Sequence, residues 1–190
     1  GASLKHFCAN NQEHIRMCID SVVDERALRE IYLAPFEYIV KTEQPTTVMC
    51  SYNRVNGTYL SDNKHMLTDV LRGEWGFKGF VVSDWASIHE MVNHGYAEDN
   101  KHAGELAINA GVDMDMMSYS YISHIEELIK EGKVSMETID NAVRNILRIK
   151  IRLGLFENPY VDESKTEASF YTPEALEAAR KSAVESAVLL

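Results

Sequence analysis

The sequence lacks the features of a disulfide-stabilised, secreted or membrane-spanning protein. Only three cysteines occur among its 190 residues, Cys8, Cys18 and Cys50, and none belongs to a C-x-x-C pair. This sparse set predicts neither a disulfide framework nor a zinc site, and it favours a reducing compartment such as the cytoplasm. No apolar run approaches the ~20 residues that a membrane span needs. The first ten residues also lack the charged and apolar regions of a secretion signal, although the chain opens directly in a strand pattern, so we expect the start to be a cut.

Positive charge is also in short supply. The chain has 19 Lys and Arg residues against 29 Asp and Glu residues, which gives a formal net charge of −10. No basic cluster offsets this balance, so nucleic acid and anionic membranes are excluded as expected partners. No glycine-rich phosphate loop occurs, and no cofactor is predicted. The 45% hydrophobic and 25% charged residues are typical of a soluble globular chain, long enough to bury a substantial core.

Strand and helix patterns alternate along the chain. Four short apolar segments predict strands, at 2–9, 46–52, 79–84 and 112–116. Helical periodicity fills the intervals between them, and residues that cap or stop helices mark most of its ends. The predicted caps are Asp24, Asp62 or Ser61, Ser135 and Thr172; the predicted stops are Gly73, Gly111, Gly132 and Gly154; and Pro35 should kink or break the first helix.

Four strand–helix units in series predict a parallel sheet covered by helices. A closed (β/α) barrel has eight such units and typically ~250 residues. We therefore expect an α/β fold that forms part of such a barrel, truncated at both ends. Residues 1–156 would be the C-terminal part of the barrel domain, and residues 157–190 a linker and first helix leading toward a further α/β domain.

Polar and aromatic residues gather where the predicted strands end. In parallel α/β folds, ligands bind at the carboxyl ends of the strands. The residues at these positions are Lys5, His6, Tyr52, Asn53, Asp84, Trp85, Asp113 and Asp115. A carboxylate beside an aromatic ring suits a sugar, because the ring covers the apolar face of a pyranose and polar groups bind its hydroxyls. A rigidly held Asp84 could attack an anomeric carbon, whereas Asp113 and Asp115 are better explained as structural residues.

Seven motifs resemble those of glycoside hydrolase family 3, of the β-glucosidase kind. They occur in the order and at the spacing of that family over nearly the whole chain. The motifs are KHF at 5–7, DERALREIYLAPF at 24–36, MCSYNRVNG at 49–57, MLTDVLRGEWGF at 66–77, GFVVSDW at 79–85, AGVDMDM at 110–116 and RLGLFENPY at 152–160.

This resemblance implies specific roles for the residues at the strand ends. Asp84, in the SDW motif, would be the catalytic nucleophile of a retaining exo-acting β-glycosidase, most simply a β-glucosidase. Lys5 and His6 would bind sugar hydroxyls. Tyr52 would lie beside the nucleophile, and Trp85 would flank the aglycone subsite. The substrate would be a β-linked oligosaccharide or glycoside.

Two departures qualify the resemblance. The N-acetylglucosaminidase branch of the family carries a KHFPGHG-like loop with an Asp-His acid/base, whereas this chain reads KHFCANN at residues 5–11, which favours the glucosidase or xylosidase branch. In that branch the acid/base is a Glu of a following α/β domain, which this sequence does not include. No motif supports Glu74 or Glu90 as a substitute, so we expect the isolated chain to be inactive.

Two alternatives remain open at this stage. The isolated chain could be a noncatalytic α/β fragment that binds sugar weakly, self-associates or pairs with the other barrel half, because an open half-barrel exposes strand edges. A metal-dependent enzyme would instead use Asp84, His89 and His94, but their spacing is not the i, i+4 pairing of a helical zinc motif, and no metal site is predicted. Ser83 lacks the flanking glycines of a nucleophile elbow.

Overall fold

A computed structural model describes residues 1–189 of the chain. The described residues divide into two compact units, Gly1–Leu153 and a second unit that begins at Gly154. The elements of the first unit are β1 (Ser3–Phe7), β2 (Asp20–Ser21), α1 (Glu25–Ala27), η1 (Leu28–Leu33), α2 (Ala34–Glu43), β3 (Thr47–Cys50), β4 (Arg54–Val55), β5 (Thr58–Tyr59), η2 (Leu60–Asp62), η3 (His65–Glu74), β6 (Phe80–Val82), α3 (Ser87–Asn93), α4 (Asn100–Ala110), α5 (Ser120–Lys130) and α6 (Met136–Arg152).

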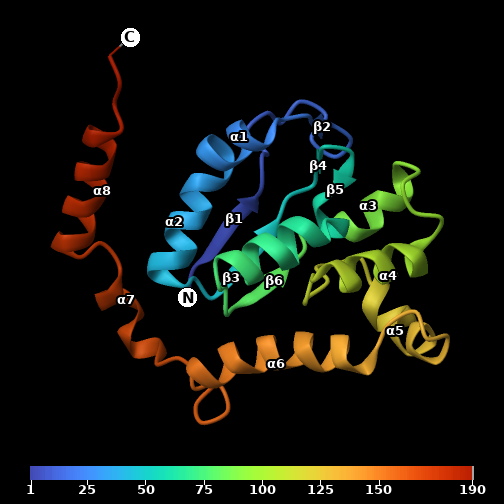
Figure 1. The fold of residues 1–190 in the computed structure, drawn as a ribbon. Helices are drawn as coiled ribbons and strands as arrows, with labels where there is room; N and C mark the ends of the chain where they lie inside the picture. Colours follow the sequence, from blue (N-terminus) through green and yellow to red (C-terminus); the bar gives the residue numbers. More distant parts are fainter. Residues whose placement is uncertain (190) are drawn as a thin grey trace. The chain divides into compact units, whose positions relative to one another are not determined.

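Three parallel strands form the main sheet, in the order β1-β3-β6 (Figure 1). The central β3 places Val48 opposite Leu4 of β1 and Val81 of β6. Val48 and Val81 are fully buried, as expected for a parallel strand covered by helices. The predicted α/β class is therefore confirmed, whereas the assignment of these strands to part of an eight-stranded (β/α) barrel remains a prediction.

The fourth predicted strand, 112–116, is wrong as a regular strand. The segment forms one isolated parallel bridge, between Val82 and Met114. It still runs alongside β6, because Asp113 N donates to Val81 O at 2.9 Å and Ser83 N donates to Met114 O at 3.0 Å. The ladder stops there because the chain turns at once toward α5, so this segment continues the parallel order without adding a full strand.

A second, smaller sheet lies beyond the carboxyl ends of β1 and β3, and the sequence did not predict it. Its order is β2-β4-β5, and each of its strands has two residues. The β4–β5 hairpin turns through Asn56 and Gly57, both at positive φ, as is typical of a two-residue Asn-Gly loop. Two-residue strands carry no periodicity, so pattern alone cannot find them.

The helix ends follow local chemistry in most places. The π-helical η1 ends at Leu33 and α2 begins at Ala34 with Pro35 in its first turn. The backbone stays helical through this junction, so Pro35 marks a change of helix type and the predicted break does not occur. Gly111 ends α4 at φ +113, and the Ser135 side chain accepts from Thr138 N to open α6. Two further expectations were wrong: η3 runs through Gly73 to Glu74, and its first turn is capped by Asn63 Oδ1, which accepts from Met66 N at 3.0 Å, not by Asp62 or Ser61.

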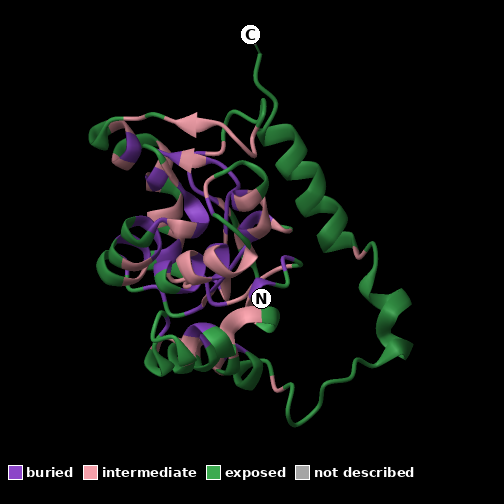
Figure 2. Ribbon diagram, turned by 90° about the vertical axis from the view of Figure 1, so that its right-hand side faces the viewer, coloured by how far each residue is buried: buried purple, intermediate pink, exposed green. Residues whose placement is uncertain are grey.

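Apolar side chains from the strands and their covering helices form one core. The ring of Phe7 packs edge-on against Phe36 and Trp75, at centroid distances of 5.3 and 5.9 Å. One face of η3 is buried against this cluster; its residues are Met66, Leu67, Val70 and Leu71. Figure 2 shows the buried residues concentrated along the strands and the inner faces of these helices. This packing fixes the carboxyl ends of the strands.

The second unit contains η4 (Glu163–Lys165), α7 (Thr166–Ser169) and α8 (Pro173–Glu185). Thr172 accepts from Ala175 N and Pro173 opens α8, as the sequence predicted. No residue of these three elements is buried. The assignment of 157–190 as a linker toward a further domain stays a prediction. Across residues 1–189, every helix is too short or too polar to cross a membrane.

Candidate active site

Asp84 lies two residues past the end of β6, in a sharply turning segment. Its neighbours are held by the parallel segment beside it: Ser83 Oγ accepts from Met116 N at 2.8 Å, and Ala86 N donates to Met116 O at 2.7 Å. Ala86 adopts φ +54, which turns the chain into α3. The Asp84 carboxylate accepts from Trp85 N at 2.7 Å, and its side chain is 14% exposed. It is therefore anchored at its base and still reachable from solvent.

His6 faces Asp84 across the sheet. Its Nε2 lies 3.4 Å from Asp84 Oδ2, and its side chain is 23% exposed. Both residues stand at the carboxyl ends of their strands, although β3 separates β1 from β6 in the sheet. Lys5 precedes His6 and is exposed; within residues 1–189 no polar contact joins it to Asp84. The structure thus brings His6 and Asp84 together, whereas Lys5 is exposed and makes no polar contact with them among the described residues.

Tyr52 lies two residues past the end of the intervening strand β3 and completes the group. Its hydroxyl donates to Trp85 O at 2.7 Å, which ties the end of β3 to the turn after β6. Burial and, second to it, the nearby negative charge of Asp84 raise the pKa of Tyr52 to about 12. The phenol therefore stays protonated at neutral pH and remains a hydrogen-bond donor. Trp85 itself is 59% exposed, so its ring is free to contact a ligand.

Arg16 belongs to this group, and the sequence reasoning missed it. Its guanidinium lies over the Tyr52 ring, 5.1 Å from the centroid. It sits in the irregular segment between β1 and β2, where no periodicity assigns a direction to any side chain. The only available signal was its position eleven residues past Lys5, within the polar run ANNQEHIR at 9–16. That signal does not reveal a contact with Tyr52.

The remaining strand-end residues are structural. Asn53 is fully buried and its amide nitrogen lies within hydrogen-bond distance of Cys8 O, Ala9 O and Ser21 Oγ, which joins the loop after β1 to β2. Asp115 accepts from the backbone at the start of α5, including Ser120 N at 2.8 Å. The expected structural role of Asp115 fits this geometry.

The Asp113 carboxylate contacts three groups outside the site at the strand ends. It accepts from Val81 N at 2.7 Å and Asn145 Nδ2 at 3.0 Å, and it pairs with Arg72. Burial nevertheless raises the pKa of Asp113, so desolvation outweighs the attraction of Arg72. The carboxylate joins η3, β6 and α6 and faces away from the strand ends.

The two alternative acids in the chain are already engaged. Glu74 binds Arg29 at 2.5 and 3.0 Å, and this hydrogen-bonded arginine lowers the pKa of Glu74. Glu90 pairs with His94, 3.0 Å away. His89 instead contacts Asn100, so the three residues of the metal alternative have separate polar partners. Within residues 1–189, no group of three or more candidate ligands is arranged to hold a metal.

A polar, partly acidic site with one exposed indole at the end of a parallel sheet suits a polyhydroxylated ligand. Comparison with known proteins defines the class. The glycosyl hydrolase family 3 N terminal domain matches residues 1–149. The chain therefore belongs to glycosyl hydrolase family 3, as its motifs indicated.

Its relatives include proteins named as glycosidases. The chain is 44% identical to thermostable beta-glucosidase B of Acetivibrio thermocellus and 36% identical to an exo-alpha-(1->6)-L-arabinopyranosidase of Bifidobacterium breve, in each case over 100% of this chain and 23% of the relative. A β-glucosidase of Listeria innocua, solved in complex with glucose, superposes with a TM-score of 0.89 at 37% identity; the match covers 99% of this chain and 26% of that one. The chain thus spans about a quarter of the length of these relatives.

Proposed function

We propose that this chain carries the nucleophile of a retaining exo-acting β-glycosidase, with a β-glucoside as the leading substrate. The observation that carries the proposal is the meeting of His6, Tyr52 and Trp85 around the Asp84 carboxylate at the strand ends. Family membership supports the reaction class, and the relative solved with glucose supports the sugar. The arabinopyranosidase among the relatives means that these residues alone do not decide the sugar.

In this mechanism Asp84 forms a covalent bond to the anomeric carbon as the aglycone leaves. His6 donates to the attacking carboxylate or to an adjacent hydroxyl, and Lys5 reaches a hydroxyl at the rim. Tyr52, which stays protonated, holds the turn that carries Asp84 and Trp85. Trp85 offers its exposed ring to the aglycone. Water then releases the sugar with retention of configuration.

The acid/base is proposed to lie outside residues 1–190, on the remaining length that the relatives possess. Two features support this. The pKa of Glu74 is lowered by Arg29, which makes it a poor proton donor near neutral pH. Glu90 is held by its contact with His94, whose Nε2 lies 3.0 Å from Glu90 Oε2. A second carboxyl in a retaining enzyme stands ~5–5.5 Å from the nucleophile, and neither residue carries a motif for that position.

The decisive experiment is labelling with an activated fluoro-sugar. A polypeptide of the relatives' length that contains this chain is incubated with the reagent, digested and analysed by peptide mass spectrometry. We expect the label on the peptide that contains Asp84, and its loss in Asp84→Asn. Asp69→Asn, which alters an exposed aspartate paired with His65 on η3, serves as the matched control and should label normally. Label on another carboxylate in the unmodified protein would refute the assignment.

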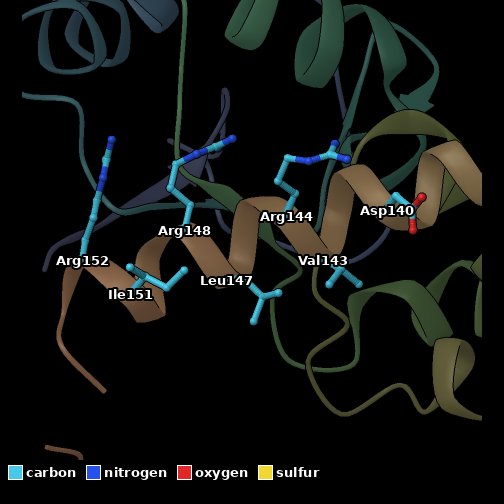
Figure 3. Close-up of a pocket in the computed structure, with 7 residues that line it drawn as sticks. All are labelled: Asp140, Val143, Arg144, Leu147, Arg148, Ile151 and Arg152. Atoms are coloured by element: carbon cyan, nitrogen blue, oxygen red, sulfur yellow. The ribbon is translucent and has the colours of Figure 1, made fainter. Parts of the chain in front are cut away.

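A second candidate concerns the isolated chain, which could be a noncatalytic fragment that self-associates. Figure 3 shows the exposed side of α6, where Val143, Leu147 and Ile151 project together. They are 46%, 40% and 60% exposed, an unusual arrangement for an apolar stripe on a helix. β1 also pairs on one side only, with β3, among the described residues.

Analytical sedimentation tests this candidate. We expect the isolated chain to form dimers or larger species, and Leu147→Glu to shift it toward monomer because the charge enters the apolar stripe. Glu126→Lys, a fully polar change on the exposed face of α5, is the control. If the unmodified chain stays monomeric at high concentration, this second candidate is refuted.

A further inference from the structure

Arg16 lies over the Tyr52 ring, although it belongs to a turn and not to a helix or strand. The turn is closed by the amides of residues 18 and 19, which both donate to Ile15 O, at 2.9 and 3.0 Å. The Arg16 side chain also pairs with Glu13 at 3.6 Å, but both side chains remain exposed to solvent, and such a pair orients its members only weakly. The place of Arg16 therefore depends on what holds the turn.

Two side chains of the β4–β5 hairpin hold this turn by its carbonyl groups. The Tyr59 hydroxyl donates to Met17 O at 3.0 Å. Arg54 Nη2 donates to Cys18 O at 2.8 Å, and Arg54 N donates to the carbonyl of the next residue at 2.9 Å. The bound carbonyls belong to the residues that directly follow Arg16. The hairpin thus fixes the backbone on the C-terminal side of Arg16.

Both donors are held in place by contacts within their own neighbourhood. Arg54 and Tyr59 are directly opposite each other in the β4–β5 pair, and the guanidinium lies over the ring, 5.6 Å from its centroid. The Tyr59 ring is 3% exposed and packs edge-on against Tyr96 at a centroid distance of 5.0 Å. Burial raises the pKa of Tyr59, so its hydroxyl stays protonated at neutral pH and remains a donor.

We propose that Arg54 and Tyr59 are positioning residues of the proposed glycosidase: by holding the carbonyls of residues 17 and 18, they place Arg16 over the Tyr52 ring beside the nucleophile. This inference rests on the proposed function and adds to it two residues that act through Arg16. Tyr52 in turn donates to Trp85 O in the turn that carries the nucleophile, so the contacts run without a break from the hairpin to the site. A displacement of about 1 Å at such a site can cost about 100-fold in rate.

The test is a double-mutant cycle on kcat/KM for an aryl β-glucoside, in a polypeptide of the relatives' length that contains this chain. Tyr59→Phe removes only the hydroxyl that binds Met17 O, and we expect it to lower kcat/KM about threefold or more. Arg54→Ala should lower it about tenfold, and Arg54→Lys, which keeps a charged donor, should recover most of that loss. When Arg16→Ala is also present, each loss should shrink to less than about twofold, because the residue that the hairpin positions is gone.

Tyr121→Phe is the matched control for the cycle. The Tyr121 hydroxyl donates to Val112 O at 2.7 Å, so this variant loses the same kind of hydrogen bond at a place outside the Arg16 turn. Its effect on kcat/KM should be the same with and without Arg16→Ala. Amide hydrogen exchange of the peptide that contains Met17 and Cys18 gives a readout that needs no activity: exchange should become faster in Tyr59→Phe and stay unchanged in Tyr121→Phe.

Separate results decide the proposal and the proposed function. Equal losses in Tyr59→Phe with and without Arg16→Ala would overturn the proposal, and so would an unchanged kcat/KM in Arg16→Ala alone. Circular dichroism identifies a variant that fails to fold; if Arg54→Ala does so, Tyr59→Phe decides, because it keeps the buried ring. A polypeptide without glycosidase activity would instead refute the proposed function, and unchanged exchange in Tyr59→Phe would then show that the hairpin does not hold the turn.

Discussion

The buried carboxylate of Asp113 should be among the most sensitive positions for stability in the first unit. Its side chain is 6% exposed and accepts from Val81 N, Asn145 Nδ2 and Arg72. Replacement by alanine leaves a buried strand N–H without its acceptor and a largely covered arginine without its partner. Removing one member of a buried ion pair typically costs about 3–5 kcal/mol. We expect Asp113→Ala to lower the free energy of unfolding by that amount.

Asp113→Asn separates charge from hydrogen bonding. Because burial already raises the pKa of Asp113, the fold partly disfavours its ionised form. The amide oxygen can still accept from Val81 N, so this variant should lose only about 1–3 kcal/mol. Glu30→Ala removes an exposed pair with Arg26 and should change stability by less than about 1 kcal/mol. Urea unfolding followed by circular dichroism measures all three, provided that the slopes agree.

One result would contradict the prediction for Asp113→Ala. A loss below about 1 kcal/mol for Asp113→Ala, on the scale of the exposed Glu30 control, would show that the three contacts of the carboxylate do not stabilise the fold.

Three further predictions follow from other positions. Arg29 lowers the pKa of Glu74, so their pair should contribute stability at neutral pH that is lost as pH falls through this lowered pKa. Because the pair is exposed, the contribution should be below about 1 kcal/mol. In Glu74→Gln the free energy of unfolding should therefore fall less on acidification than in the unmodified chain. Gly111→Ala should destabilise by about 1–3 kcal/mol in thermal unfolding, because φ is +113 and a Cβ would meet Thr68 Oγ1 at 2.8 Å; an unchanged midpoint would contradict this. The isolated chain should not hydrolyse cellobiose. Dinitrophenyl β-glucoside should give the highest residual turnover, because its leaving group needs little help from an acid. Cellobiose hydrolysis that disappears in Asp84→Ala would instead reveal an acid within the chain.

The fold was predictable where local chemistry decides it. Gly111 ends its helix because a residue at positive φ stops helical hydrogen bonding without steric strain, and the Ser135 hydroxyl satisfies an N–H that the helix leaves free. The prediction of the η3 cap was wrong because Ser61, Asp62 and Asn63 are all residue types that cap helices well. Only the path of the preceding 3-10 turn decides which of them faces the helix.

The site was predictable to the extent that strand ends define it. His6, Tyr52 and Asp84 converge because parallel strands end at the same edge of the sheet, so alternation and order along the chain were enough. Arg16 lies in an irregular segment whose course depends on the β2-β4-β5 sheet, which is itself invisible in the sequence pattern. Its position over Tyr52 is therefore fixed by tertiary packing.

The convergence at the strand ends also explains why the SDW segment combines an acid with small and aromatic neighbours. Ser83 must be small and polar, because its hydroxyl is buried and accepts from the backbone of the adjoining segment. Ala86 takes a left-handed conformation that turns the chain into α3, and a β-branched residue there would be more strained than alanine. Trp85, between them, has its backbone held at both N–H and carbonyl, while its ring stays in solvent. The turn thus fixes the Asp84 backbone from both sides, and the energy of positioning the carboxylate is supplied by folding before any ligand arrives.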